Sequence, residues 1–140
     1  MQTETSLLRA TFTRPAIRDF VLSFYGRVRA DPMLGPVFEA RIEDWDTHLE
    51  RMQTFWGTVL RAEPGYVPIK GPPPRLHARI PGLTVAHYDR WLELFHEVIE
   101  PRFEPWAVEN IMGRARRIAM SFSDDVREEF RRRERADTDA

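Results

Sequence analysis

The chain has 140 residues, the size of a single domain, and its 42% hydrophobic and 31% charged side chains argue against a disordered chain. Its formal net charge is −1, whereas a nucleic-acid-binding module is usually clearly basic, so we expect no nucleic-acid partner. Cysteine is absent, which excludes disulfides, thiolate metal sites and a cysteine nucleophile.

The first predicted helix begins after Thr13, a side chain that can cap the free backbone amides of a helix start, and it ends at Asp31-Pro32. Apolar residues recur within it at offsets of three and four, which predicts one buried face. These residues are Ile17, Phe20, Val21, Phe24 and Val28. A turn bounded by prolines follows over residues 32–36.

Two further helices are predicted over about residues 43–60 and 84–99, the second with Thr84 as its cap. Aromatic and aliphatic side chains mark one face of each helix. On the first helix these are Trp45, His48 or Leu49, Met52, Phe55 or Trp56, and Val59, and on the second they are Tyr88, Trp91, Leu92, Phe95, Val98 and Ile99.

A fourth, long helix is predicted from about Pro105 to Phe130, and the charged residues 131–140 are expected to fray. Residues 62–82 hold six prolines and three glycines, which prevent a long helix there. A loop of this length is usually functional or disordered. No stretch alternates as a strand does, so we predict an all-α protein with a single domain over residues 1–140 and a core over about residues 13–130.

Common catalytic motifs are missing from the sequence. His96-Glu97 opens like the zinc motif HExxH, but Glu100 stands where the second histidine belongs. There is no phosphate-binding glycine loop and no GxSxG elbow. The histidines, tryptophans and tyrosines are left as candidates for a site, and we nominate no catalytic residue.

Two of the histidines have two interpretations each. His48 lies three residues after Trp45 and four before Met52, on the apolar face of its predicted helix. It is either a hydrogen-bonded core histidine or part of a ligand pocket, because burying an unpartnered imidazole is costly. His77 follows three prolines in the irregular segment. It is either a surface histidine or a side chain that the irregular backbone aims at a site.

The other candidates are judged from their helical positions. His87 and His96 are nine residues apart, half a turn out of phase, so both are expected to contact solvent. Tyr25 and Trp91 occupy inward positions, where a large aromatic side chain is usually part of the core. Each carries one polar atom that needs a partner when buried. The pattern leaves open whether Tyr25, His48 and Trp91 converge on one pocket.

Several blocks of the sequence resemble the group III truncated haemoglobins. The blocks FYGRVRAD at residues 24–31 and LGPVF at residues 34–38 resemble the opening of that family. WDTH at residues 45–48, followed by Phe55-Trp56, resembles its distal helix.

The second half of the chain continues the resemblance. PRLH at residues 74–77 resembles the proximal segment of the family, and RWLELF at residues 90–95 resembles the helix after it. The resemblance covers about residues 15–125 with the order and approximate spacing of the blocks kept. The sequence departs from the family at residues 72–74, where three prolines crowd the stretch before the proximal histidine in a lengthened loop.

The resemblance implies a shortened globin fold, in which two pairs of helices form a two-over-two sandwich around haem b. It makes His77 the proximal iron ligand and places Tyr25, His48 and Trp91 on the distal side. Four further side chains are implied for the apolar wall or its supporting core, and these are Phe38, Met52, Phe55 and Trp56. The absence of cysteine independently favours histidine as the axial ligand.

The implied function is the binding of O2, CO and NO at the haem iron. O2 gains negative charge on ferrous haem, so nearby donors stabilise it. The hydroxyl of Tyr25 and the ring N–H groups of Trp91 and His48 are the donors that the resemblance offers. An O2 ligand that is held tightly suits redox chemistry or sensing better than transport.

Two alternatives stay open. One is an NO dioxygenase or peroxidase-like enzyme at the same haem, which would need a separate reductase because the chain has no nucleotide-binding motif. The other is a haem-free helical module that binds an anionic partner through Arg114, Arg116, Arg117 and the arginine-rich tail. No apolar run approaches the roughly 20 residues of a membrane span, and the first ten residues do not resemble a signal peptide. We therefore expect a cytoplasmic monomer or homodimer.

Overall fold

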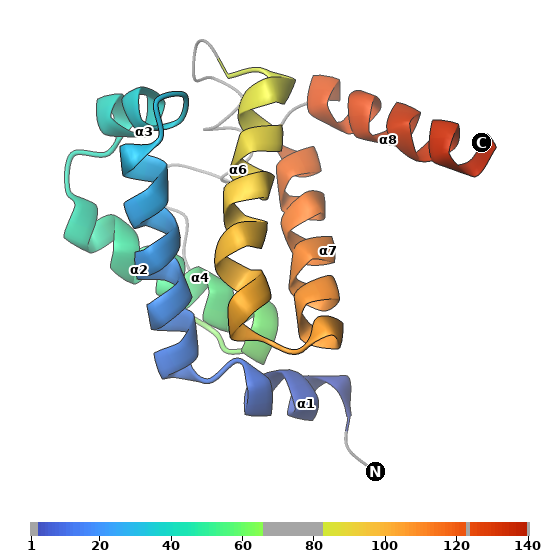
Figure 1. Cartoon of the computed structure of the whole chain (residues 1–140). Coiled ribbons are helices and arrows are strands. Elements are labelled where there is room, and N and C mark those ends of the chain that lie inside the picture. The colour runs from blue at the N-terminus through green and yellow to red at the C-terminus, as the bar shows by residue number, and fades with distance from the viewer. Residues whose placement is uncertain (1–2, 66–82, 123, 140) are drawn as a thin grey trace.

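Helices account for all regular structure in residues 3–65, 83–122 and 124–139, which are the residues that the computed structural model describes (Figure 1). The prediction of an all-α protein is confirmed. A short 3-10 helix, η1 (Glu100–Arg102), follows α6 directly. The α-helices are α1 (Glu4–Thr11), α2 (Arg14–Ala30), α3 (Gly35–Arg41), α4 (Trp45–Arg61), α6 (Val85–Ile99), α7 (Pro105–Ser121) and α8 (Asp124–Asp139).

Side-chain caps explain where the principal helices start. The Thr13 hydroxyl accepts a hydrogen bond from the amide of Ala16 and caps α2, as predicted. Asp44 caps α4 in the same way through the amide of Thr47. Thr84 is the N-cap of α6, also as predicted. The apolar faces of these three helices therefore begin in the register that the sequence indicated.

Two short helices were not predicted. The helix α1 precedes the expected core, yet Leu8 and the adjoining Phe12 are buried in that core. A turn is present at residues 32–34, and α3 begins in the last two residues of the expected turn, with Pro36 in its first turn, where a missing N–H costs nothing. Gly35 opens α3 because a Cβ there would lie 2.7 Å from the carbonyl oxygen of Arg29.

The predicted fourth helix is two helices. α7 ends at Ser121 and α8 points away from it, toward the C-terminus (Figure 1). Residues 131–139, which were expected to fray, belong to α8 in the structure. Val126 and Phe130 pack with Tyr88 of α6, and the Arg133 guanidinium bonds both carboxylate oxygens of Asp89 at 2.8 and 3.0 Å. These contacts hold a segment whose charge alone favours fraying.

An aromatic cluster lies where α2, α4 and α6 meet. Phe20 of α2 packs edge-on against Trp56 of α4, with ring centroids 5.9 Å apart, and equally against Phe95 of α6. Trp56 and Phe95 stack with centroids 5.2 Å apart and planes 13° from parallel. Burial of these large rings is the main driving force that holds the three helices together. Their relative positions fix the side chains that project beyond the cluster.

One buried ion pair ties the end of α2 to α6. The Asp31 side chain is 3% exposed and accepts hydrogen bonds from the amides of Met33 and Leu34 and from Arg90 Nε at 2.9 Å. Burial by itself would raise the pKa of Asp31, but the Leu34 amide, Arg90 and the Met33 amide outweigh it and hold the pKa below its usual range. The ion pair of Asp31 with Arg90 therefore fixes the position of Leu34 and α3 relative to α6, at the residue that precedes Trp91.

We expect Asp31→Asn to lower the free energy of unfolding by about 2 kcal/mol at pH 7, because it removes the charge that Arg90 and two amides bind. The ordinary Asp pKa near 3.9 lies above that of folded Asp31, so this stability is present above pH ~4 and is lost as the pH falls below it. Urea unfolding should therefore show that the difference in the free energy of unfolding between wild type and variant becomes smaller below pH ~4.

The matched control is Asp19→Asn. Asp19 pairs with Arg102, but its side chain is 66% exposed, so its loss should cost under about 1 kcal/mol. Equal losses for the two variants, or a gap that is independent of pH, would contradict the role assigned to Asp31.

Candidate functional site

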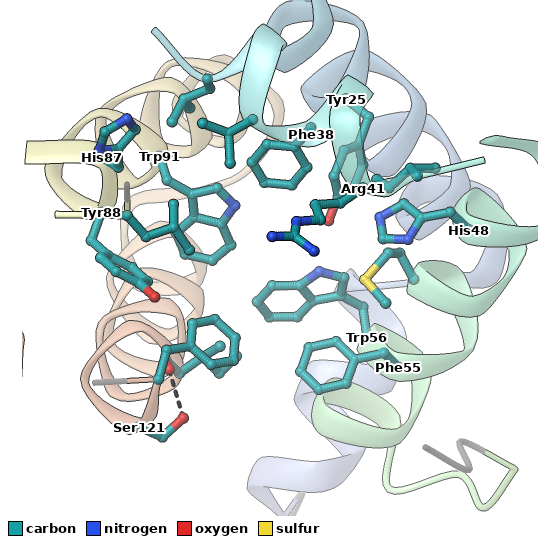
Figure 2. Close-up of a pocket in the computed structure, with 17 residues that line it drawn as sticks. Tyr25, Phe38, Arg41, His48, Phe55, Trp56, His87, Tyr88, Trp91 and Ser121 are labelled. Atoms are coloured by element: carbon teal, nitrogen blue, oxygen red, sulfur yellow. Dashed lines mark hydrogen bonds between the residues drawn. The ribbon is translucent and has the colours of Figure 1, made fainter. Parts of the chain in front are cut away.

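A cavity of about 380 Å³ lies between α4 on one side and α6 with the end of α7 on the other, closed at one end by α2 and α3 (Figure 2). Its volume is within the range of ligand pockets, roughly 300–1,000 Å³. All the described residues that the sequence nominated for a site line it, and these are Tyr25, Phe38, His48, Met52, Phe55, Trp56 and Trp91.

Three side chains with polar tips reach this cavity from three different helices. Tyr25 comes from α2, His48 from α4 and Trp91 from α6, and Figure 2 shows them facing the same space. The rings of Tyr25 and His48 meet edge to face, with centroids 5.0 Å apart. Tyr25 and Trp91 both pack against Phe24, at 5.0 and 5.6 Å. The convergence that the pattern left open is therefore present.

Polar contacts outside the cavity hold Trp45, which supports His48. Trp45 packs edge-on against His48 at 5.7 Å, and its ring N–H donates to the carboxylate of Glu39 at 3.3 Å. Arg29 bonds the same carboxylate at 2.8 Å and places its guanidinium 4.3 Å above the Trp45 ring. The bond from Arg29, together with that from Trp45, holds the pKa of Glu39 below its usual range.

Flat aromatic surfaces form much of the wall. Trp56 and Trp91 line the cavity, and Phe95, which is fully buried and does not line it, packs between them with ring planes 13° and 3° from parallel. Phe55 continues this surface with its ring 5.4 Å from that of Trp56. Parallel rings with few polar atoms suit a flat and largely apolar ligand, and haem has these properties. The described part of the pocket therefore fits the cofactor that the sequence resemblance implies.

Four polar lining residues were missed by the sequence analysis. His87 was expected to contact solvent, and it is half-buried, but it also lines the cavity, with Nδ1 3.2 Å from the Thr84 amide and 3.0 Å from its hydroxyl. His96 is exposed, as expected. Tyr88 is buried, and this burial raises the pKa of its phenol. Its place in the cavity could have been predicted from the sequence, because Tyr88 lies one helical turn before Trp91 on the same apolar face. The remaining missed residues are Arg41 and Ser121.

His77, the predicted iron ligand, lies outside the described residues. Among the residues that are described, no group of three or more His, Cys, Asp or Glu side chains could hold a metal ion. The described helices include none that is both long and apolar enough to cross a membrane.

Known proteins match this chain over most of its length. The sequence profile of the bacterial-like globins matches residues 12–123. The group 3 truncated hemoglobin ctb of Campylobacter jejuni is 30% identical over 116 residues, which cover 80% of this chain and 89% of that protein. The crystal structure of a group III truncated hemoglobin from Campylobacter jejuni superposes with a TM-score of 0.73 at 29% identity and covers 87% of this chain and 92% of that one. The chain therefore belongs to the group III truncated haemoglobins of the bacterial-like globin family.

Proposed function

We propose that this protein holds haem b in the cavity between α4 and α6 and binds O2, CO and NO at its iron. Membership of the family implies a haem cofactor and the binding of diatomic ligands. The observation that carries the proposal for this chain is the convergence of Tyr25, His48 and Trp91 on one aromatic cavity. Three converging hydrogen-bonding tips in a largely apolar slot suit a small ligand that becomes negatively polarised.

His77 is the proposed axial ligand of the iron. It precedes Leu83, a residue that lines the cavity, by six positions. Six residues span at most about 20 Å, so the chain can bring an imidazole to this pocket from Leu83. Phe38, Met52, Phe55 and Trp56 are the proposed contacts with the faces and edges of the porphyrin.

Haem supplies an iron with one coordination position open to a diatomic ligand. The chain supplies the donors around that position, which are the Tyr25 hydroxyl and the ring N–H groups of Trp91 and His48. A hydrogen bond to a charged acceptor contributes roughly 1.5–3 kcal/mol, so two of them slow O2 release by about two to four orders of magnitude. Such retention suits redox chemistry or sensing better than transport.

A second candidate function uses the same pocket as an enzyme for NO dioxygenation or peroxide reduction. The contact of Tyr25 and His48, with ring centroids 5.0 Å apart, favours it. Histidine is the side chain that most readily exchanges a proton near neutral pH, and tyrosine is a suitable hydrogen-bond partner for such a transfer. Electrons would come from a separate reductase.

The haem-free alternative has no support of its own. Arg114 bonds Asn110 and Glu4, Arg133 pairs with Asp89, and other arginines of α8 pair with acidic residues of the same helix. These pairs neutralise much of the positive charge of α7 and α8, which weakens this alternative, although Arg116 and Arg117 are exposed.

An absorption spectrum of the full chain tests the proposal. Ferric haemin added in equal amount should give a Soret band, and reduction under CO should shift and sharpen it. A chain that takes up no haemin would refute the proposal. Repeated addition of NO to the O2-loaded protein then separates the two candidates. Sustained NO consumption in the presence of a reductase supports the enzyme, and a single stoichiometric loss supports a binding protein or sensor.

A further inference from the structure

Arg41 ends a row of residues that face the cavity from α3. It follows Val37 by four positions and Phe38 by three, and these offsets place the three side chains on one face of the helix. All three line the cavity, and Figure 2 shows the Arg41 guanidinium turned toward it. Arg41 is exposed and also lines the cavity, which places this residue where the pocket meets solvent.

The charge of Arg41 is not used elsewhere in the described part of the molecule. Among the described lining residues it alone carries a permanent charge. Arg29 and Arg90 lie nearby, but they pair with Glu39 and Asp31. Arg41 forms no ion pair or hydrogen bond with any described residue. A guanidinium at the edge of an apolar cavity favours a ligand with an anionic group at the matching edge.

Haem b has this combination of properties. Its porphyrin is flat and apolar, and two carboxylates project from one edge. We propose that Arg41 binds a haem carboxylate at the mouth of the pocket and so selects the edge of haem that stays near solvent. This inference rests on the proposed function, because it needs haem to occupy the cavity. Arg41 acts here on retention and orientation of the cofactor and does not act on the diatomic ligand.

The test compares two cofactors in two proteins. Haemin and its dimethyl ester differ only in the two carboxylates, and Arg41→Met removes only the charge and its donors. The measured quantity is the rate of porphyrin loss to an excess of a haem-scavenging protein, followed by the Soret band. In the wild type, the ester should leave faster than the acid. In Arg41→Met the ratio of the two rates should shrink by about five- to tenfold, the size of a charge-assisted bond near solvent.

Four further measurements guard the interpretation. Arg116→Met removes an exposed arginine of α7 that does not line the cavity, and it should leave the ratio unchanged. Arg41→Lys keeps the charge and should restore part of the ratio. Raising the salt concentration should lower the wild-type ratio and not that of Arg41→Met. Far-UV circular dichroism checks that each variant is folded.

The outcomes separate this inference from the function beneath it. A wild type that takes up neither porphyrin refutes the proposed function and this inference with it. Haemin binding with the same acid-to-ester ratio in wild type and Arg41→Met refutes the inference alone. A change in O2 release with an unchanged ratio also refutes it, because Arg41 would then face the diatomic ligand.

Discussion

Replacement of His77 by alanine is expected to abolish stable haem binding, or to leave a protein that binds haem only with added imidazole. The reason is that one axial ligand from the chain holds the iron, and free imidazole can enter the space that the deleted ring leaves. The Soret band of the reconstituted variant, with and without imidazole, measures the effect. An unchanged ferrous spectrum without imidazole would remove His77 from the role.

His87→Ala is the matched control, and its place in the cavity makes it a demanding one. His87 follows His77 by ten positions in the sequence, and it lines the cavity. Its Nδ1 accepts a hydrogen bond from the Thr84 amide at 3.2 Å, so a neutral ring carries its proton on Nε2 and offers no lone pair to iron. We therefore expect His87→Ala to bind haem normally. If His87→Ala loses haem and His77→Ala retains it, then His87 and not His77 is the axial ligand of the iron.

Periodicity predicted the three helices that form the site because each has both a cap and a regular apolar face. Thr13 and Thr84 mark the starts of α2 and α6, and the inward positions of Tyr25 and Trp91 follow from those starts. The convergence of these side chains with His48 was not predictable from one helix at a time. It depends on how the three helices cross, and the packing of Phe20, Trp56 and Phe95 sets that crossing.

The errors come from interactions between segments that are distant in the sequence. The charge of residues 131–140 suggested that they would not stay helical, but Arg133 forms an ion pair with Asp89, a residue 44 positions earlier. The position of His87 in the cavity was missed because its offset from His96 carries no information about its contact with Thr84 or about the cavity that α3 and α4 complete. Arg41 could have been noticed from its spacing to Val37 and Phe38, if the residues that follow the turn had been recognised as a helix.

Tyr25→Phe and Trp91→Phe are each expected to speed O2 dissociation by about tenfold or more, since the loss of roughly 1.4 kcal/mol corresponds to one decade. Each change removes one donor from the cavity and keeps an aromatic ring in place. Stopped-flow release of O2 from the ferrous protein measures the rate. CO carries far less negative charge, so CO dissociation should change much less in the same variants.

Tyr88→Phe is the matched control for Tyr25→Phe, because it deletes the same hydroxyl from another buried tyrosine of the same cavity. Figure 2 shows Tyr88 and Ser121 on the opposite side of the cavity from Tyr25 and His48, so O2 release should stay near the wild-type rate. Equal changes in O2 and CO release for Tyr25→Phe would point to altered pocket shape and would reject the hydrogen-bond account.

The double variant Tyr25→Phe/Trp91→Phe shows whether the two donors act independently. Both rings pack on Phe24, with centroids 5.0 and 5.6 Å from it, so removal of one donor is felt by the other through a shared neighbour. Contacting residues usually show coupling of roughly 0.5–3 kcal/mol. We therefore expect the O2 release rate of the double variant to differ from the product of the two single effects by more than about twofold. An additive result would mean that Phe24 does not couple the two rings, and each donor would then contribute separately to O2 retention.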